Sequence, residues 1–161
     1  MVSASDLIAI KREHLKRLAN QSGAAGEQHV LSENSALFPR PTGRELAALL
    51  TTLEQSGIRI KGSSFDAVSL PTGAVANYFD PEIVAKAIFI EIKTANQTRV
   101  QADFTGFFFA FTEGEIQAAE ALGSRHRVML LNRATGQTLL TSVPELLARA
   151  KSTTWQVSIQ L

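Results

Sequence analysis

The sequence has no cysteine, one tryptophan and one tyrosine among its 161 residues. Without cysteine the chain can form no disulfide, no thiolate metal site and no cysteine nucleophile. Its net charge is only +1, so a basic surface for nucleic acid would have to come from local clustering. No apolar segment of the sequence approaches the roughly 20 residues that a membrane span requires, and the N-terminus has no apolar run of the signal-peptide type. These absences predict a cytoplasmic protein with no membrane partner.

What is present suits one globular domain. The chain is 45% hydrophobic and 19% charged, as ordinary soluble proteins are, and its length suffices to bury a core. We expect a single domain over residues 1–161, with helices in residues 1–57 and a sheet core with further helices in residues 58–161.

Helix signals dominate the first third of the chain. One helix is expected near the N-terminus and another over residues 24–36, which follow a glycine-punctuated stretch. Residues 38–41, Phe-Pro-Arg-Pro, are expected to break the second helix. Thr42 with Glu45 resembles a capping box that opens a third helix, which would end at Gly57.

Extended chain follows these helices. Strands are expected in residues 57–71, 85–95 and 100–112, and the last of these holds five of the nine phenylalanines, which favour sheets. Thr112 is then expected to cap a short helix, followed by two strands joined by a turn, a helix opened by Pro144 and a final strand. Because helices come before, within and after the strands, we predict an α/β or α+β protein with a central mixed sheet.

The segment IFIEIKT, residues 88–94, is the clearest strand. Its isoleucines alternate with Phe89, Glu91 and Lys93, which is the period of two that a strand requires. Glu91 and Lys93 therefore share one face, with Cα atoms about 7 Å apart. Charges in so apolar a strand are costly to bury unless they are paired or neutralised by a metal. The pair belongs either to a solvated face of the sheet or to a functional site.

A second carboxylate can reach the same place. A hairpin that folds residues 66–70 against residues 88–93 would bring Asp66 next to Glu91. Two carboxylates suit Mg²⁺, which prefers hard oxygen ligands and would polarise a phosphate and acidify a bound water. A lysine beside them would orient that water and stabilise the developing charge. Asp80 is the alternative first acid; Asp66 is favoured because Asp80 lies in a predicted turn.

At this point the residues resemble a known family. Asp66-Ala-Val followed by Phe89-Ile-Glu91-Ile-Lys93-Thr is similar to the core motif of the PD-(D/E)XK, or restriction-endonuclease-like, nuclease superfamily. Gly23-Ala-Ala-Gly26-Glu27 resembles the G-x-x-G-E helix that often precedes this core. The Thr-x-x-Glu helix and its flanking strands are similar to the subgroup related to the NO VEIN C-terminal domain. The resemblance covers residues 23 to about 133, but Phe65 stands where the family usually has proline.

The resemblance implies a fold, an activity and roles for individual residues. The fold would be α/β, a restriction-endonuclease-like central mixed sheet flanked by helices. The activity would be Mg²⁺-dependent cleavage of DNA, with Mn²⁺ as a substitute, in restriction, defence or repair. Because one site cuts one strand, a homodimer is a plausible partner. The residues so implied are the metal ligands Asp66, Glu91 and Ile92 (by its carbonyl), the water-holding Lys93, the supporting carboxylate Glu27 and the polar contributor Gln101.

The remaining candidates carry weaker signals. Glu113 and Glu115 are expected only to populate the first turn of a helix, where carboxylates suit the helix dipole. The three histidines show no spacing typical of a zinc site. Five basic residues could face DNA phosphates, although a charged helix face is more often simply solvated. They are Lys11, Lys16, Arg17, Arg125 and Arg127.

The rival hypothesis is a non-catalytic interaction or scaffold domain within a larger assembly. In that case Glu91 and Lys93 would form a surface pair that contributes little to stability. Metal-induced stabilisation would separate the two hypotheses, since only a real site raises the melting temperature by binding a cation.

Overall fold

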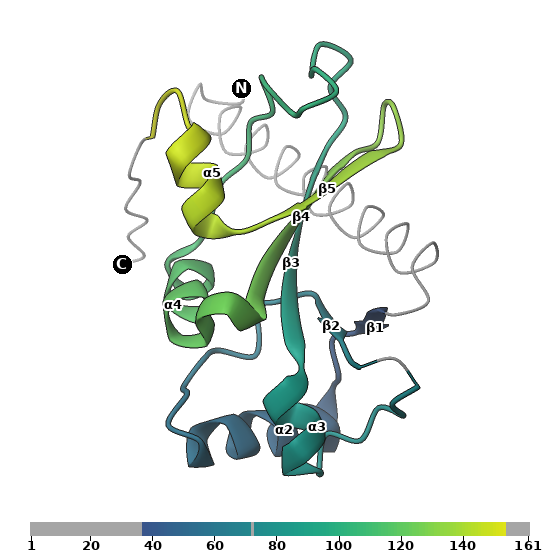
Figure 1. The fold of residues 1–161 in the computed structure, drawn as a ribbon, viewed down its shortest axis with the longest axis vertical. Coiled ribbons are helices and arrows are strands. Elements are labelled where there is room, and N and C mark those ends of the chain that lie inside the picture. Colours follow the sequence, from purple (N-terminus) through teal and green to yellow (C-terminus); the bar gives the residue numbers. More distant parts are fainter. Residues whose placement is uncertain (1–36, 72, 154–161) are drawn as a thin grey trace, which may run out of the picture.

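The computed structural model describes residues 37–71 and 73–153 (Figure 1). The two helices expected before residue 37 and the strand expected after residue 154 lie outside the described residues. So do Glu27, Lys11, Lys16 and Arg17, whose predicted roles therefore stay predictions.

The described chain is α/β, with a five-stranded mixed sheet flanked by helices (Figure 1). The strands are β1 (Leu37–Pro39), β2 (Ala67–Ser69), β3 (Ile88–Ala95), β4 (His126–Asn132) and β5 (Gln137–Thr141). The helices are α2 (Gly43–Gln55), α3 (Pro81–Lys86), α4 (Glu113–Leu122), the 3-10 helix η1 (Gly123–Arg125) and α5 (Val143–Arg149).

The sheet has the order β1-β2-β3-β4-β5. Neighbouring strands are antiparallel except β3 and β4, which run parallel. A parallel pair needs a crossover, and here the long connection from β3 to β4 contains α4. The predicted hairpin between the Asp66 segment and the Glu91 strand is confirmed, because β2 pairs antiparallel with β3.

Two local predictions near the start of the described chain were wrong in detail. Residues 37–39 form the short strand β1 instead of a simple break, since they pair with β2. Thr42 does precede α2, but its side chain makes no capping hydrogen bond within the described chain. The helix is held instead by its apolar face, where Leu49 and Leu53 are buried, as is usual when packing outweighs local signals.

The predicted strand over residues 100–112 was also wrong. The segment is an irregular loop, because turn-forming residues interrupt it. The Asp103 carboxylate accepts hydrogen bonds from the backbone N–H and the hydroxyl of Thr105, both at 3.0 Å. Phe104 has φ +64 and Gly106 has φ +89, which no regular strand allows. Turn chemistry therefore overrides the sheet preference of the phenylalanines.

The phenylalanine rings still pack from this loop. Phe104 is buried, and Phe107, Phe109 and Phe111 pack against a cluster that includes β4 and α5 side chains. Successive rings of these four lie 5.2 to 5.8 Å apart between centroids. Phe108 alone turns outward and is 78% exposed. The prediction of a phenylalanine core is thus confirmed for four of the five rings.

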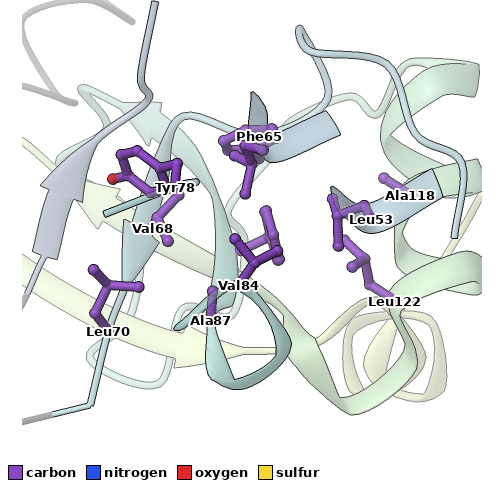
Figure 2. Close-up of a cluster of buried hydrophobic side chains, with 11 residues drawn as sticks. Leu53, Phe65, Val68, Leu70, Tyr78, Val84, Ala87, Ala118 and Leu122 are labelled. Carbon is purple, nitrogen blue, oxygen red and sulfur yellow. The ribbon is translucent and has the colours of Figure 1, made fainter. Parts of the chain in front are cut away.

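The largest buried cluster joins α2, α3 and α4 to β2 and β3 (Figure 2). Phe65 and Phe89 are fully buried members of this cluster, with their rings edge to face and centroids 5.1 Å apart. A second cluster lies around the isoleucines of β3 and includes Ile90, Ile92 and Met129. In the described ranges, none of the helices has the length and apolarity that crossing a membrane would take.

Candidate functional site

The first residue of the site is Asp66, which immediately precedes β2 and does not follow the regular hydrogen-bonding pattern of a strand. The Asp66 carbonyl accepts from the Arg40 N–H beside β1 at 2.9 Å, whereas its own N–H donates to the Ile90 carbonyl of β3 at 2.8 Å. A regular strand residue directs both groups to the same neighbour, so the backbone twists here as it does in a β-bulge. The Asp66 carboxylate then accepts the Ile92 N–H at 2.8 Å. This contact fixes the carboxylate at the edge of β3, beside Glu91.

Glu91 and Lys93 lie in the middle of β3. The Lys93 Nζ is 2.8 Å from Glu91 Oε1 and 2.7 Å from Oε2 of Glu115 in α4. It also lies 5.3 Å from the ring centroid of Phe111, within the range of a cation–π contact. The Glu91 and Lys93 side chains are only 6% and 14% exposed. The pair therefore occupies a buried, charge-compensated position and not a solvated face.

Glu115 was missed as a site residue. Its Oε2 accepts both the Lys93 ammonium and the Thr112 N–H, the latter at 2.9 Å, while the Glu115 N–H donates to the Thr112 hydroxyl at 3.3 Å. The capping box was visible in the sequence, and the prediction that Thr112 caps α4 is confirmed. The second role of the carboxylate depends on α4 crossing over β3, and no local pattern indicates that contact.

The buried charges shift one another's pKa values. Burial, together with the charges of Asp66 and Glu115, raises the pKa of Glu91 to about 8 against the opposing effect of Lys93. Burial also raises the pKa of Asp66, although the Ile92 N–H and the charge of Lys93 work against it. Burial alone would lower the pKa of Lys93, but Glu91 and Glu115 outweigh it and raise that pKa. Near neutral pH the site thus retains a proton between two adjoining carboxyls beside a charged ammonium.

The carboxyl pair of Asp66 and Glu91 fits a divalent cation. The two groups do not both ionise easily, so a bound cation would displace the proton that they retain. Mg²⁺ commonly uses one or two carboxylates plus waters as its ligands. Within residues 37–71 and 73–153, no group of three or more histidine, aspartate or glutamate side chains is arranged to hold a metal. A metal at this place would therefore depend on Asp66 and Glu91 with water and backbone oxygens.

The alternative acid, Asp80, lies elsewhere. It is the N-cap of α3, where its Oδ1 accepts the Glu82 N–H at 2.9 Å. The structure thus brings Asp66, and not Asp80, to Glu91. The helix α3 itself was not predicted, although an aspartate followed by Pro81 is a helix-start signal. Gln101 lies exposed in the irregular loop, and no hydrogen bond joins its side chain to Glu91 or Lys93.

The two described arginines of the predicted DNA surface do not gather at the site. The Arg125 guanidinium donates to the Val84 and Ala85 carbonyls at 2.9 and 3.0 Å, so it closes the end of α3. Arg127 pairs with Ile90 across the parallel strands, and alternation places it on the face opposite Glu91. Their predicted contact with phosphate stays a prediction, because the geometry gives it no support.

His126 is a further buried polar residue that the sequence did not single out. It is 2% exposed, and neither ring nitrogen has a hydrogen-bond partner in the described part of the chain. Burial lowers its pKa, whereas the charge of Glu115 raises it and that of Lys93 lowers it, so the ring lies near both. A single histidine without a spaced partner carries no sequence signal for such a place.

Comparison with known proteins adds no relative. No family model matches the chain, and neither curated proteins nor solved structures give a match. The chemistry of the site must therefore be argued from its own residues.

Proposed function

We propose that this chain is a metal-dependent nuclease of restriction-endonuclease-like fold that hydrolyses DNA phosphodiester bonds. The observation that carries the proposal is the meeting of Asp66 and Glu91 beside a buried Lys93, with the pKa of Glu91 raised to about 8. Strongly shifted pKa values of this kind gather at functional sites. The five-stranded mixed sheet flanked by helices is compatible with the fold.

Asp66 and Glu91 would hold Mg²⁺, or Mn²⁺ in its place, with the Ile92 carbonyl as the further ligand that the family resemblance implies. When bound, the cation would polarise the phosphate and acidify a water ligand. The twist at Asp66 supports this assignment, because it turns the carboxylate toward Glu91 and leaves Asp66 the more accessible of the two. Glu27 remains the predicted supporting carboxylate.

Lys93 would act as a hydrogen-bond donor and not as a base. The carboxylates of Glu91 and Glu115 raise its pKa and keep it protonated at neutral pH. A charged ammonium can hold the attacking water by its oxygen and stabilise negative charge on the phosphate. Glu115 positions this ammonium, since it contacts Lys93 from α4 at 2.7 Å. The same proposal includes a role in restriction, defence or repair, and assembly of the chain as a homodimer.

One observation favours the alternative of a non-catalytic interaction domain. Lys93 is already compensated by two carboxylates within the protein, so the network is complete without an added cation. Buried ion pairs of this type also occur where they serve only structure. The two functions differ in what they predict for metal binding and for cleavage.

The first test is thermal unfolding with and without Mg²⁺ or Mn²⁺. We expect millimolar metal to raise the Tm of the wild type by mass action, and Glu91→Ala to abolish the rise. Glu113→Gln is the matched control, because Glu113 lies at the same helix start as Glu115 but is exposed. No shift in the wild type would favour the interaction domain.

The second test is nicking of plasmid DNA in the presence of Mn²⁺. We expect Lys93→Ala to lower the rate by about 10²–10³-fold, which is the usual cost of one charge-stabilising donor. Glu113→Gln should cleave at the wild-type rate. Equal nicking by the wild type and Lys93→Ala would refute the assigned mechanism.

A further inference from the structure

Arg40 is a charged residue that no sequence pattern assigns to the site. It stands between Pro39 and Pro41, and the second proline restricts Arg40 to an extended backbone. Its backbone N–H donates to the Asp66 carbonyl at 2.9 Å. The residue is therefore held directly beside Asp66 by a rigid stretch of chain.

The side chain of Arg40 is held as well. One guanidinium nitrogen, Nη1, donates to the Phe65 carbonyl at 3.1 Å. Arg40 nevertheless remains an exposed residue, and a guanidinium has five N–H donors in all. Its charge reaches Asp66, where it favours the ionised carboxylate. The guanidinium is thus anchored at an exposed position next to the Asp66 segment, whereas Lys93 is largely buried.

We infer that Arg40 binds a phosphate group of the nucleic-acid substrate next to the Asp66–Glu91 carboxylates. This inference rests on the proposed function, and it adds a substrate-binding residue to it. Arginine matches phosphate because its planar fork can donate two parallel hydrogen bonds to two phosphate oxygens. Anchoring by the Phe65 carbonyl reduces the freedom that such a long side chain would lose on binding.

The competing explanation is that Arg40 only clamps the twisted backbone at residues 65 and 66. Both roles predict some loss of stability when the side chain is shortened. Only phosphate binding predicts a change in how affinity depends on salt, because each cation that neutralises a phosphate releases counterions. The salt dependence of binding is therefore the deciding measurement.

The experiment measures binding of a fluorescent DNA oligonucleotide by anisotropy between 50 and 200 mM salt, on the order of the range in which phosphate contacts lose affinity. Ca²⁺ replaces Mg²⁺, since it also takes oxygen ligands but with a looser geometry. Arg40→Gln removes the charge and the fork, and Arg40→Lys keeps the charge alone. Arg59→Gln is the control, because Arg59 is an exposed arginine that pairs only with Glu54 within the described chain.

We expect Arg40→Gln to raise the Kd about ten-fold and to lower the salt slope by about one, as the loss of one phosphate contact would. Arg40→Lys should keep the slope but bind about three-fold more weakly than the wild type, because a lysine lacks the fork. Arg59→Gln should match the wild type in both quantities.

An unchanged Kd and slope in folded Arg40→Gln overturns the inference while the proposed function stands. If Arg40→Gln fails to fold, Arg40→Lys decides, and wild-type affinity in that variant overturns the inference. If the wild type neither binds nor cleaves DNA, the proposed function fails first and the role of Arg40 fails with it.

Discussion

The two faces of β3 are buried to a similar extent but are built on different principles. On one face Ile90 and Ile92 are 2% and 5% exposed and pack among other apolar side chains. On the other face Glu91 is 5% exposed, yet it contacts Lys93, and Lys93 contacts Glu115. Apolar burial holds the first face, whereas on the second the desolvation of polar and charged groups must be offset through their mutual contacts.

This difference shows that exposure alone does not distinguish the charged face of β3 from its apolar face. Glu91 and Lys93 are not a solvated surface pair, because both side chains are largely buried. A protein that needed only a core could have used apolar residues at both positions at lower cost.

The first prediction concerns the pH dependence of the charged face. Because the folded state raises the pKa of Glu91 from 4.5 to about 8, the folded protein binds a proton more tightly than the unfolded chain does. The stabilisation is complete below pH 4.5 and is lost as the pH rises through about 8. We expect a loss on the order of several kcal/mol between these limits. Urea unfolding of the wild type and Glu91→Gln measures it, and an equal loss in both proteins would contradict it.

The second prediction concerns the apolar face. Ile90→Ala removes buried methylene groups from a packed cluster, so we expect the free energy of unfolding to fall by about 3 kcal/mol. The loss should be the same at pH 5 and at pH 8, since no titrating group is changed. Urea unfolding at the two pH values checks both statements. A loss that varied with pH would show that the two faces are coupled.

The third prediction returns to the charged face. Glu115→Ala removes the helix carboxylate from Lys93 and opens the capping box of α4. We expect a destabilisation of about 2 kcal/mol from the lost cap and the lost charge-assisted bond together. Glu113→Gln, at the exposed start of the same helix, should change stability by less than about 0.5 kcal/mol. Thermal unfolding compares the two variants.

The fourth prediction is the smallest. His126 lies on the charged side of the sheet without hydrogen-bond partners in the described chain, and burial lowers its pKa. Replacing it by leucine removes an unsatisfied buried polar group, so we expect a gain of about 1 kcal/mol at neutral pH. The gain should grow as the pH falls below 6.5, because the wild type then loses the stability of the neutral ring. A destabilised His126→Leu would indicate that the imidazole has a polar role.

Local patterns predicted part of this architecture. The alternation in residues 88–94 indicated β3, and Thr112 with its following glutamate indicated the start of α4. Both signals are contained within one element, where spacing alone determines which side chains share a face. The interval between Asp66 and Glu91 suggested a hairpin, and β2 does pair with β3.

The parts that escaped prediction depend on contacts between distant segments. The second role of Glu115 requires α4 to lie over β3, and the place of Arg40 requires β1 to pair beside Asp66. The loop that contains Phe104 has the aromatic content of a strand, but the turn formed by Asp103 and Thr105 prevents regular extended structure.

One oxygen atom has a consequence for how the site forms. Oε2 of Glu115 accepts from the Thr112 N–H at the start of α4 and from the Lys93 ammonium on β3. The first turn of the helix and the orientation of the lysine therefore share a single acceptor. Lys93 therefore has its full set of contacts only in a state in which α4 is docked and its cap is closed. Fraying of that one turn would remove the Glu115 contact from Lys93 without unfolding the sheet. Hydrogen exchange at the Thr112 amide should therefore report how often this contact is formed.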